Sequence, residues 1–209
     1  TSIPDVAVDG TSVSYQGIVN QALNAESPGI TNFGNIYGCI ANINIMLQKT
    51  LEADYMTEEE KAYYLGQAYG LRAFYYYHAL TYWGGVPLLQ DEITSLDQVK
   101  NVKRATKDEL AKFIIDELEE VSPLLKKNPA VVARISKGAS YTLLAKMYLL
   151  QKQWEKAAGA CEEVMGLNKY KLFDNYSDIF SQAFENEQEH IFSIQFNADY
   201  TDFSARMLW

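Results

Sequence analysis

The 209-residue sequence contains few of the residues that metal centres and nucleophilic sites require, with only two cysteines and two histidines. Cys39 and Cys161 occupy apolar positions of predicted helices far apart in the chain. We expect buried free thiols there, with a disulfide as the less favoured alternative. Neither His78 nor His190 has a second ligand at zinc spacing, and no phosphate loop or G-x-S-x-G motif occurs. The sequence therefore predicts neither a metal site nor a cofactor.

Runs of basic residues are also absent, because 18 lysines and arginines face 27 acidic residues, for a formal charge of -9. Nucleic-acid binding requires basic patches that release counterions, so this function class is disfavoured. The same argument disfavours binding to an anionic membrane surface. The chain starts at Thr1 without the regions of a signal peptide, so any such peptide was removed or never present.

The stretch from residue 62 to residue 90 has a single formal charge, Arg72, and is long enough to suggest a membrane span. Its seven tyrosines argue against one, since a span is rich in leucine, isoleucine and valine. We predict a central helix buried among other helices, with the tyrosines providing apolar bulk. Reading these rings as a sugar-stacking platform is the less favoured alternative. A buried Arg72 must be paired, which favours a structural role over ligand contact.

Local signals mark the ends of this helix and of its neighbour. Thr57 and Glu60 form a predicted capping box, and Gly84, Gly85 and Pro87 end the helix. The preceding segment, "FGNIYGCIANINIMLQKTL", has apolar residues at helical spacing. The two helices are joined by "EADYMT", which predicts an antiparallel hairpin.

The second half of the chain repeats this organisation. A second capping box, Thr106 and Glu109, begins "RATKDELAKFIIDELEEVSPLL". The stretch "SKGASYTLLAKMYLLQKQWEKAAGACEEVMGL" has the spacing of a tetratricopeptide (TPR) repeat, carried by Tyr141, Leu144, Ala145, Tyr148, Ala157 and Cys161. "YSDIFSQAF" predicts a short helix, and the alternation in "EHIFSIQF", residues 189–196, predicts a strand. The expected fold is mainly α, with TPR-like hairpins, irregular loops and this one short strand.

Five segments in order resemble the SusD/RagB family, nutrient-binding outer-membrane lipoproteins of Bacteroidetes. They are "FGNIYGCIANIN", "LRAFYYYHALTYWGGVPLL", "RATKDELAKFIIDELEEV", "ARISKGASYTLLAKMYLLQKQWEKA" and "ENEQEHIFSIQF". The resemblance implies an outward-facing lipoprotein that binds an oligosaccharide or other nutrient and passes it to a SusC-like TonB-dependent transporter. The lipidated cysteine is absent, so we expect the anchor to lie before this sequence. Relatives continue beyond the position of Trp209.

We expect one SusD-like domain over residues 1–209, in three parts. Residues 1–31 are predicted to be irregular, residues 32–187 to form the TPR-like scaffold, and residues 188–209 to form the strand and an irregular tail. The packed hairpins use their aromatic residues in the core, so exposed rings beside polar groups are expected at the two irregular ends. The candidate ligand-binding residues are Asp5, Asp9, Tyr15, Gln16, Asn20, Asn197, Tyr200, Asp202 and Trp209. Two merely flexible ends are the alternative.

Two other function classes remain open. Helical hairpins by themselves support a TPR scaffold that binds a protein or peptide as well as they support a glycan-binding protein. The acidic pairs Asp116/Glu117 and Glu119/Glu120 resemble the two carboxylates of a glycoside hydrolase. We expect them on the solvent-exposed face of a capped helix, which argues against an enzyme.

Overall fold

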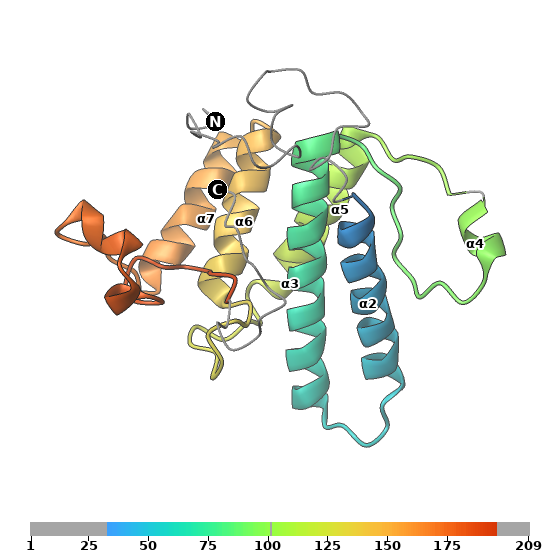
Figure 1. Cartoon of the computed structure of the whole chain (residues 1–209), viewed down its shortest axis with the longest axis horizontal. Helices are drawn as coiled ribbons and strands as arrows, with labels where there is room; N and C mark the ends of the chain where they lie inside the picture. The colour runs from blue at the N-terminus through green and yellow to red at the C-terminus, as the bar shows by residue number, and fades with distance from the viewer. Residues whose placement is uncertain (1–32, 101, 196–209) are drawn as a thin grey trace, which may run out of the picture.

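The structure is a computed structural model that describes residues 33–100 and 102–195, apart from the side chain of Leu96 (Figure 1). The α-helices are α2 (Phe33–Glu52), α3 (Glu58–Trp83), α4 (Leu96–Lys100), α5 (Lys107–Val121), α6 (Lys137–Leu150) and α7 (Trp154–Gly166). Two 3₁₀ turns follow, η1 (Tyr176–Phe180) and η2 (Gln182–Phe184). The prediction of a mainly α fold is confirmed, and "YSDIFSQAF" is helical as expected.

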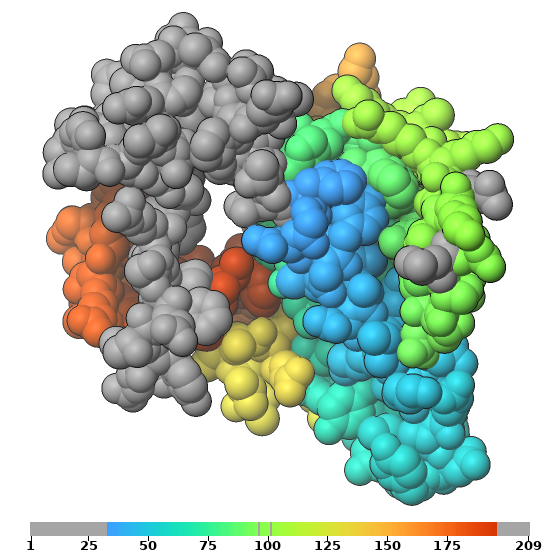
Figure 2. Space-filling model, turned by 45° about the vertical axis from the view of Figure 1, so that its right-hand side comes forward, coloured from blue at the N-terminus to red at the C-terminus, as the bar shows by residue number. Residues whose placement is uncertain are grey.

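The helices other than α4 form a row in which each packs on the next. Helices α2 and α3 make the predicted antiparallel hairpin, α5 packs against α3, and α6 and α7 form a second hairpin next to α5 (Figure 1). Figure 2 shows α2 on one outer face, with the segment that leads to α4 beside it. This arrangement is TPR-like, as the sequence predicts.

Both predicted capping boxes are present. The Thr57 hydroxyl accepts a hydrogen bond from the Glu60 amide at 3.2 Å, and the Glu60 carboxylate accepts one from the Thr57 amide at 2.9 Å. Thr106 and Glu109 repeat this pattern at the start of α5. Helix α3 ends where Gly84 adopts a positive φ of 75° and donates to the Leu80 carbonyl. Local sequence signals, the capping boxes and the glycine, therefore set these helix ends.

The core lies along α3, where Tyr76 is completely buried. Other side chains without exposed surface come from the helices around it, and they include Ile40, Leu110, Ile114, Leu118 and Met147. The tyrosine-rich helix thus supplies core bulk, as predicted, although Tyr82 at its end is 73% exposed. Among the described residues, no helix is long and apolar enough to cross a membrane.

The strand and the burial of the cysteines were predicted wrongly. In the described part of "EHIFSIQF", residues 189–195, no strand forms, because the backbone pairs with no neighbouring strand there. Phe192 instead packs its ring against Phe74 of α3 at 5.5 Å between centroids. Both cysteines are free. Cys161 is exposed, because Ala157 and Ala160 are the buried residues of α7, and Cys39 is half-buried.

Close packing at Gly70 predicts opposite effects for two glycine-to-alanine substitutions. A β-carbon at Gly70 would lie 2.9 Å from Cγ2 of buried Ile135, whereas one at exposed Gly38 would meet nothing within 4 Å. We expect Gly70→Ala to lower the free energy of unfolding by about 1–2 kcal/mol through overpacking. We expect Gly38→Ala to raise it by about 0.5–1 kcal/mol through helix propensity. Urea denaturation measures both, and equal effects at the two positions would contradict the packing of α3 on Ile135.

Candidate functional site

All nine candidate ligand residues lie outside the described residues, so their placement stays a prediction. Within residues 33–100 and 102–195, polar side chains converge on the stretch Gly84–Asp91, which follows α3 and which we call the anchored segment. Gln67, by contrast, binds the backbone of Ile135 on the other side of α3, through its amide nitrogen at 2.8 Å and its oxygen at 2.9 Å. The anchored segment is where the chain leaves the scaffold.

Side chains of α2 and α3 hold the backbone of the anchored segment. The buried Tyr76 hydroxyl accepts from the Leu89 amide at 2.7 Å and donates to the Leu89 carbonyl at 2.8 Å. The Asn44 amide nitrogen donates to the carbonyls of Leu89 and Asp91 at 3.1 and 3.0 Å. Tyr37 donates to the Pro87 carbonyl. These bonds give the backbone of an irregular stretch the hydrogen-bond partners that a neighbouring strand would otherwise provide.

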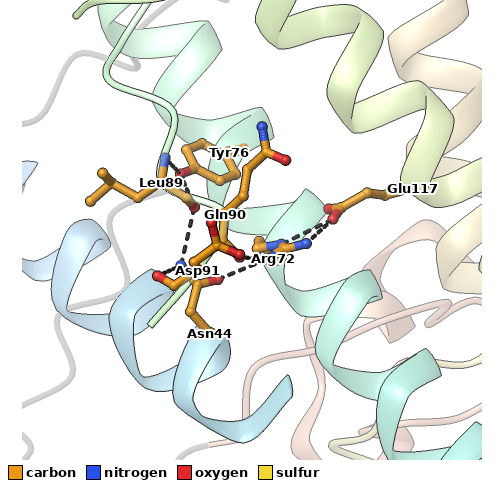
Figure 3. A network of polar contacts seen from close by, with 7 residues as sticks. All are labelled: Asn44, Arg72, Tyr76, Leu89, Gln90, Asp91 and Glu117. Atoms are coloured by element: carbon orange, nitrogen blue, oxygen red, sulfur yellow. Dashed lines mark hydrogen bonds and ion pairs between the residues drawn. The ribbon is translucent and has the colours of Figure 1, made fainter. Parts of the chain in front are cut away.

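Arg72 lies at the centre of this network and is 4% exposed (Figure 3). Its Nε donates to Oε1 of Glu117 on α5 at 3.0 Å, and its Nη2 contacts the same oxygen. Its Nη1 donates to Oδ1 of Asn44 at 2.8 Å and to the carbonyl of Gln90 at 2.7 Å. One guanidinium therefore joins α2, α3, α5 and the anchored segment, which confirms the structural role predicted for Arg72.

Glu117 corrects the prediction that the acidic residues of α5 all face solvent. Its side chain is 8% exposed, and its Oε2 has no hydrogen-bond partner. Burial raises the pKa of Glu117 to about 7, against the lowering effect of Arg72. Glu117 follows buried Leu110 by seven residues and Ile114 by three, which is core spacing. That spacing was the available sequence signal.

A second arginine joins the two ends of the segment that connects α3 to α5. Arg104 donates to the carbonyls of Gly85 and Trp83, and the backbone of Ala105 donates to Val86 at 3.0 Å. The stretch that carries α4 projects from this closed base (Figure 1). The Arg72 and Arg104 contacts therefore have a positioning role, because they hold backbone and present no open catalytic group.

The remaining titratable candidates carry no reactive arrangement. His78 is half-buried beside Phe74 and Tyr82, and burial lowers its pKa below the usual value, with a smaller contribution from Lys146. This environment makes His78 a packing residue of α3. Across the described residues, no three His, Cys, Asp or Glu side chains gather as metal ligands would.

A groove of about 630 Å³ runs along the hairpin of α6 and α7. Tyr141, Leu144, Tyr148 and Ala160 give it apolar walls, and a β-carbon at Gly159 would meet nothing within 4 Å. Its charged lining residues are Lys137, Lys156, Glu162 and Glu163. The groove shows that small residues of α7 leave space beside the tyrosines of α6.

A family model for SusD-like proteins, described as "Starch-binding associating with outer membrane", matches residues 2–149. Because this match covers most of the chain, the protein belongs to the SusD-like family. The resemblance seen in the sequence is thereby confirmed.

Individual relatives support this family assignment. The chain is 30% identical to SusD-like protein P38 of Formosa agariphila, over 79% of this chain and 33% of that protein. SusD-like protein P25 of the same organism is 25% identical over 79% of this chain and 32% of its own length. The chain thus spans about a third of these curated relatives.

Solved structures share the fold. A SusD superfamily protein from Parabacteroides distasonis gives a TM-score of 0.81 at 27% identity, covering 91% of this chain and 43% of that one. A laminarin-binding SusD-like protein also gives 0.81, at 24% identity over 88% of this chain and 41% of that one, which shows the fold alone.

The buried ion pair predicts a strong coupling between Arg72 and Glu117. We expect Arg72→Met to lower the free energy of unfolding by about 3–5 kcal/mol, because a buried carboxylate loses its counterion. The double variant Arg72→Met/Glu117→Leu should lose less than the sum of the two single variants, by about 2 kcal/mol. Denaturant titration of all four proteins measures this.

The exposed pair Lys112–Asp116 on the same helix is the matched control, with nitrogen and oxygen 2.5 Å apart. Its removal should cost less than about 1 kcal/mol. An equally small coupling for Arg72 and Glu117 would contradict a central role for the buried pair.

Proposed function

We propose that this chain is part of a cell-surface glycan-binding protein that delivers oligosaccharides to a SusC-like TonB-dependent transporter. In this proposal an N-terminal lipid anchor holds the protein on the outer face of the outer membrane. The match of residues 2–149 to a starch-binding, outer-membrane family carries the proposal. Starch, which the family description names, is a glycan, and this supports a glycan as the ligand.

The chemistry of the described residues supports binding rather than cleavage. Three of the four carboxylates considered for hydrolysis have partners. Glu117 is paired with Arg72, and Glu119 accepts from Tyr148 at 2.5 Å and from Lys156 at 3.2 Å. Asp116 is paired with Lys112. A glycosidase needs one protonated and one free carboxyl group on either side of the bond, and these residues serve other contacts. In the proposal the protein therefore binds glycans and leaves them intact.

The first experiment tests the irregular ends, where the nine candidate ligand residues lie. In the whole protein, Tyr15→Ala and Trp209→Ala should each weaken glycan binding by about 1–2 kcal/mol, the size of a lost aromatic contact. Isothermal calorimetry measures the loss. Tyr55, 85% exposed in the turn between α2 and α3, provides the control Tyr55→Ala, for which no change is expected. Unchanged affinity in both test variants would place the site elsewhere.

The proposed partner is tested in native membranes. Mild detergent extraction followed by affinity purification of the tagged protein should recover a TonB-dependent transporter in near-stoichiometric amount. Identification of the co-purified bands by mass spectrometry provides the readout. Recovery of the tagged protein without any such transporter would contradict the proposed delivery step.

The groove along α6 and α7 favours one other candidate, a TPR-type scaffold that binds a protein or peptide. Open space at Gly159 beside the Tyr141 ring would accept a side chain of a docked helix. The calorimetric experiment separates the two functions, because a peptide-binding scaffold would bind no glycan even with Tyr15 and Trp209 intact.

A further inference from the structure

The carboxyl group of Glu117 on α5 is hydrogen-bonded at one oxygen only. Nε of Arg72 donates to Oε1 at 3.0 Å and Nη2 donates to the same oxygen, whereas Oε2 is buried and has no partner. An arginine often binds a carboxylate through both oxygens, with one N–H on each. Here the ionised form leaves one buried oxygen without compensation for its lost water. Oε2 is therefore an atom that can take a proton while every bond of Arg72 is kept.

The charges around this carboxyl group oppose each other. Burial is the largest influence and favours the neutral form, Arg72 on α3 favours the ionised form, and Glu120 on α5 again favours the neutral form. The balance raises the pKa of Glu117 to about 7. The phenol groups of Tyr69 and Tyr76 also come from α3, and burial raises the pKa of both, to about 12 for Tyr76, so they carry no charge at neutral pH.

Helix α2 and the anchored segment bind Arg72 through uncharged groups (Figure 3). Nη1 donates to Oδ1 of Asn44 at 2.8 Å and to the carbonyl of Gln90 at 2.7 Å. Asp91 takes part through its backbone carbonyl, which accepts from the Asn44 amide at 3.0 Å. None of these bonds uses an oxygen of Glu117, so protonation of that carboxyl group leaves all of them in place.

We propose that Glu117 is the proton-binding site of a pH-sensitive latch, in which a proton on Oε2 tightens the hold of the scaffold on the anchored segment. With the segment in place, Arg72 and Glu117 are shielded from water, and the neutral carboxyl group is favoured. When the segment leaves Arg72, water reaches the pair and restores the usual preference for the ionised form. The closed state therefore binds the proton more tightly, and by linkage the proton stabilises the closed state.

The sign of the effect follows from the two pKa values of this group. A hydrated glutamate titrates at about 4.3, whereas Glu117 in the closed state has a pKa of about 7. The stabilisation by the proton is complete below the lower value and is lost as the pH rises through the upper one. The anchored segment is therefore held most firmly in mildly acidic solution.

This latch depends on burial, which α2, α3, α5 and the anchored segment already provide. Chain packed outside these elements would add cover and leave the direction unchanged. The latch involves no ligand and is independent of the proposed glycan binding.

An NMR titration of the side-chain carboxyl carbons of the whole protein tests the proton site. Glu117→Gln, which has the shape of the neutral acid, identifies the signal of Glu117 by its loss. We expect its midpoint to lie about two pH units above that of exposed glutamates. Glu120→Gln should lower this midpoint, because it removes the nearby negative charge. A midpoint at or below the usual glutamate value would show that Arg72 keeps the carboxylate ionised, and would overturn the latch.

Hydrogen exchange of the Leu89 amide, which donates to the Tyr76 hydroxyl at 2.7 Å, measures opening of the anchored segment. After correction for the intrinsic pH dependence of exchange, the opening equilibrium constant should fall about 10- to 30-fold from pH 8 to pH 5.5 in the wild-type protein. It should be independent of pH in Glu117→Gln. No change in the wild-type protein, or the same change in the variant, would contradict the proposal.

The Ile135 amide is the matched control within the same molecule. It donates at 2.9 Å to the side-chain oxygen of Gln67, on the other side of α3, and this partner does not titrate. We expect its opening equilibrium constant to change much less than that of Leu89. An equal change at Ile135 would show that the proton acts on unfolding of the whole scaffold, and would rule out a latch on the anchored segment.

Discussion

The charge of Arg72 is the constraint on which the described structure depends. A guanidinium inside a helical core is tolerated only when every strong donor finds an acceptor. Glu117 provides the opposite charge, Asn44 a side-chain oxygen and Gln90 a backbone carbonyl. Because these acceptors come from α5, α2 and the anchored segment, their relative positions are set around α3. A Leu at the same place would fill volume without setting any of these positions.

This constraint divides the chain into a scaffold and the segments that leave it. The helices place most of their aromatic residues in or against the core, with Tyr76 both filling volume and holding Leu89. Tyr176 and Phe180, both exposed, lie on a segment outside the helical row. A rigid scaffold with functional groups on irregular excursions is a common arrangement for binding proteins. Membership of the SusD-like family agrees with this division, since the family match over residues 2–149 includes α2 to α5 and most of α6.

Features with local causes could be predicted from the sequence. The capping boxes at Thr57 and Thr106 and the glycine stop after α3 depend on residues within one turn of each other, and all three are present. Features with distant causes were missed. The counterion of buried Glu117 is Arg72, which lies 45 residues earlier in the chain. The alternation around Phe192 is typical of a strand, but a strand needs a neighbouring strand to pair with. Phe192 instead packs its ring against that of Phe74.

The candidate ligand residues illustrate the same limit. Tyr15 and Trp209 were chosen from composition and position, and a sequence does not state which rings a fold leaves exposed. Tyr176 and Phe180 were part of a predicted helix, and their exposure was not predicted.

Glycan binding without cleavage is the central claim, and one measurement tests it most directly. The whole protein is applied to an array of neutral and charged oligosaccharides, and the same oligosaccharides are incubated with it in solution and analysed by chromatography. The account predicts retention of neutral glycans on the array and intact oligosaccharides in solution. Retention of none, or release of shorter products, would contradict it.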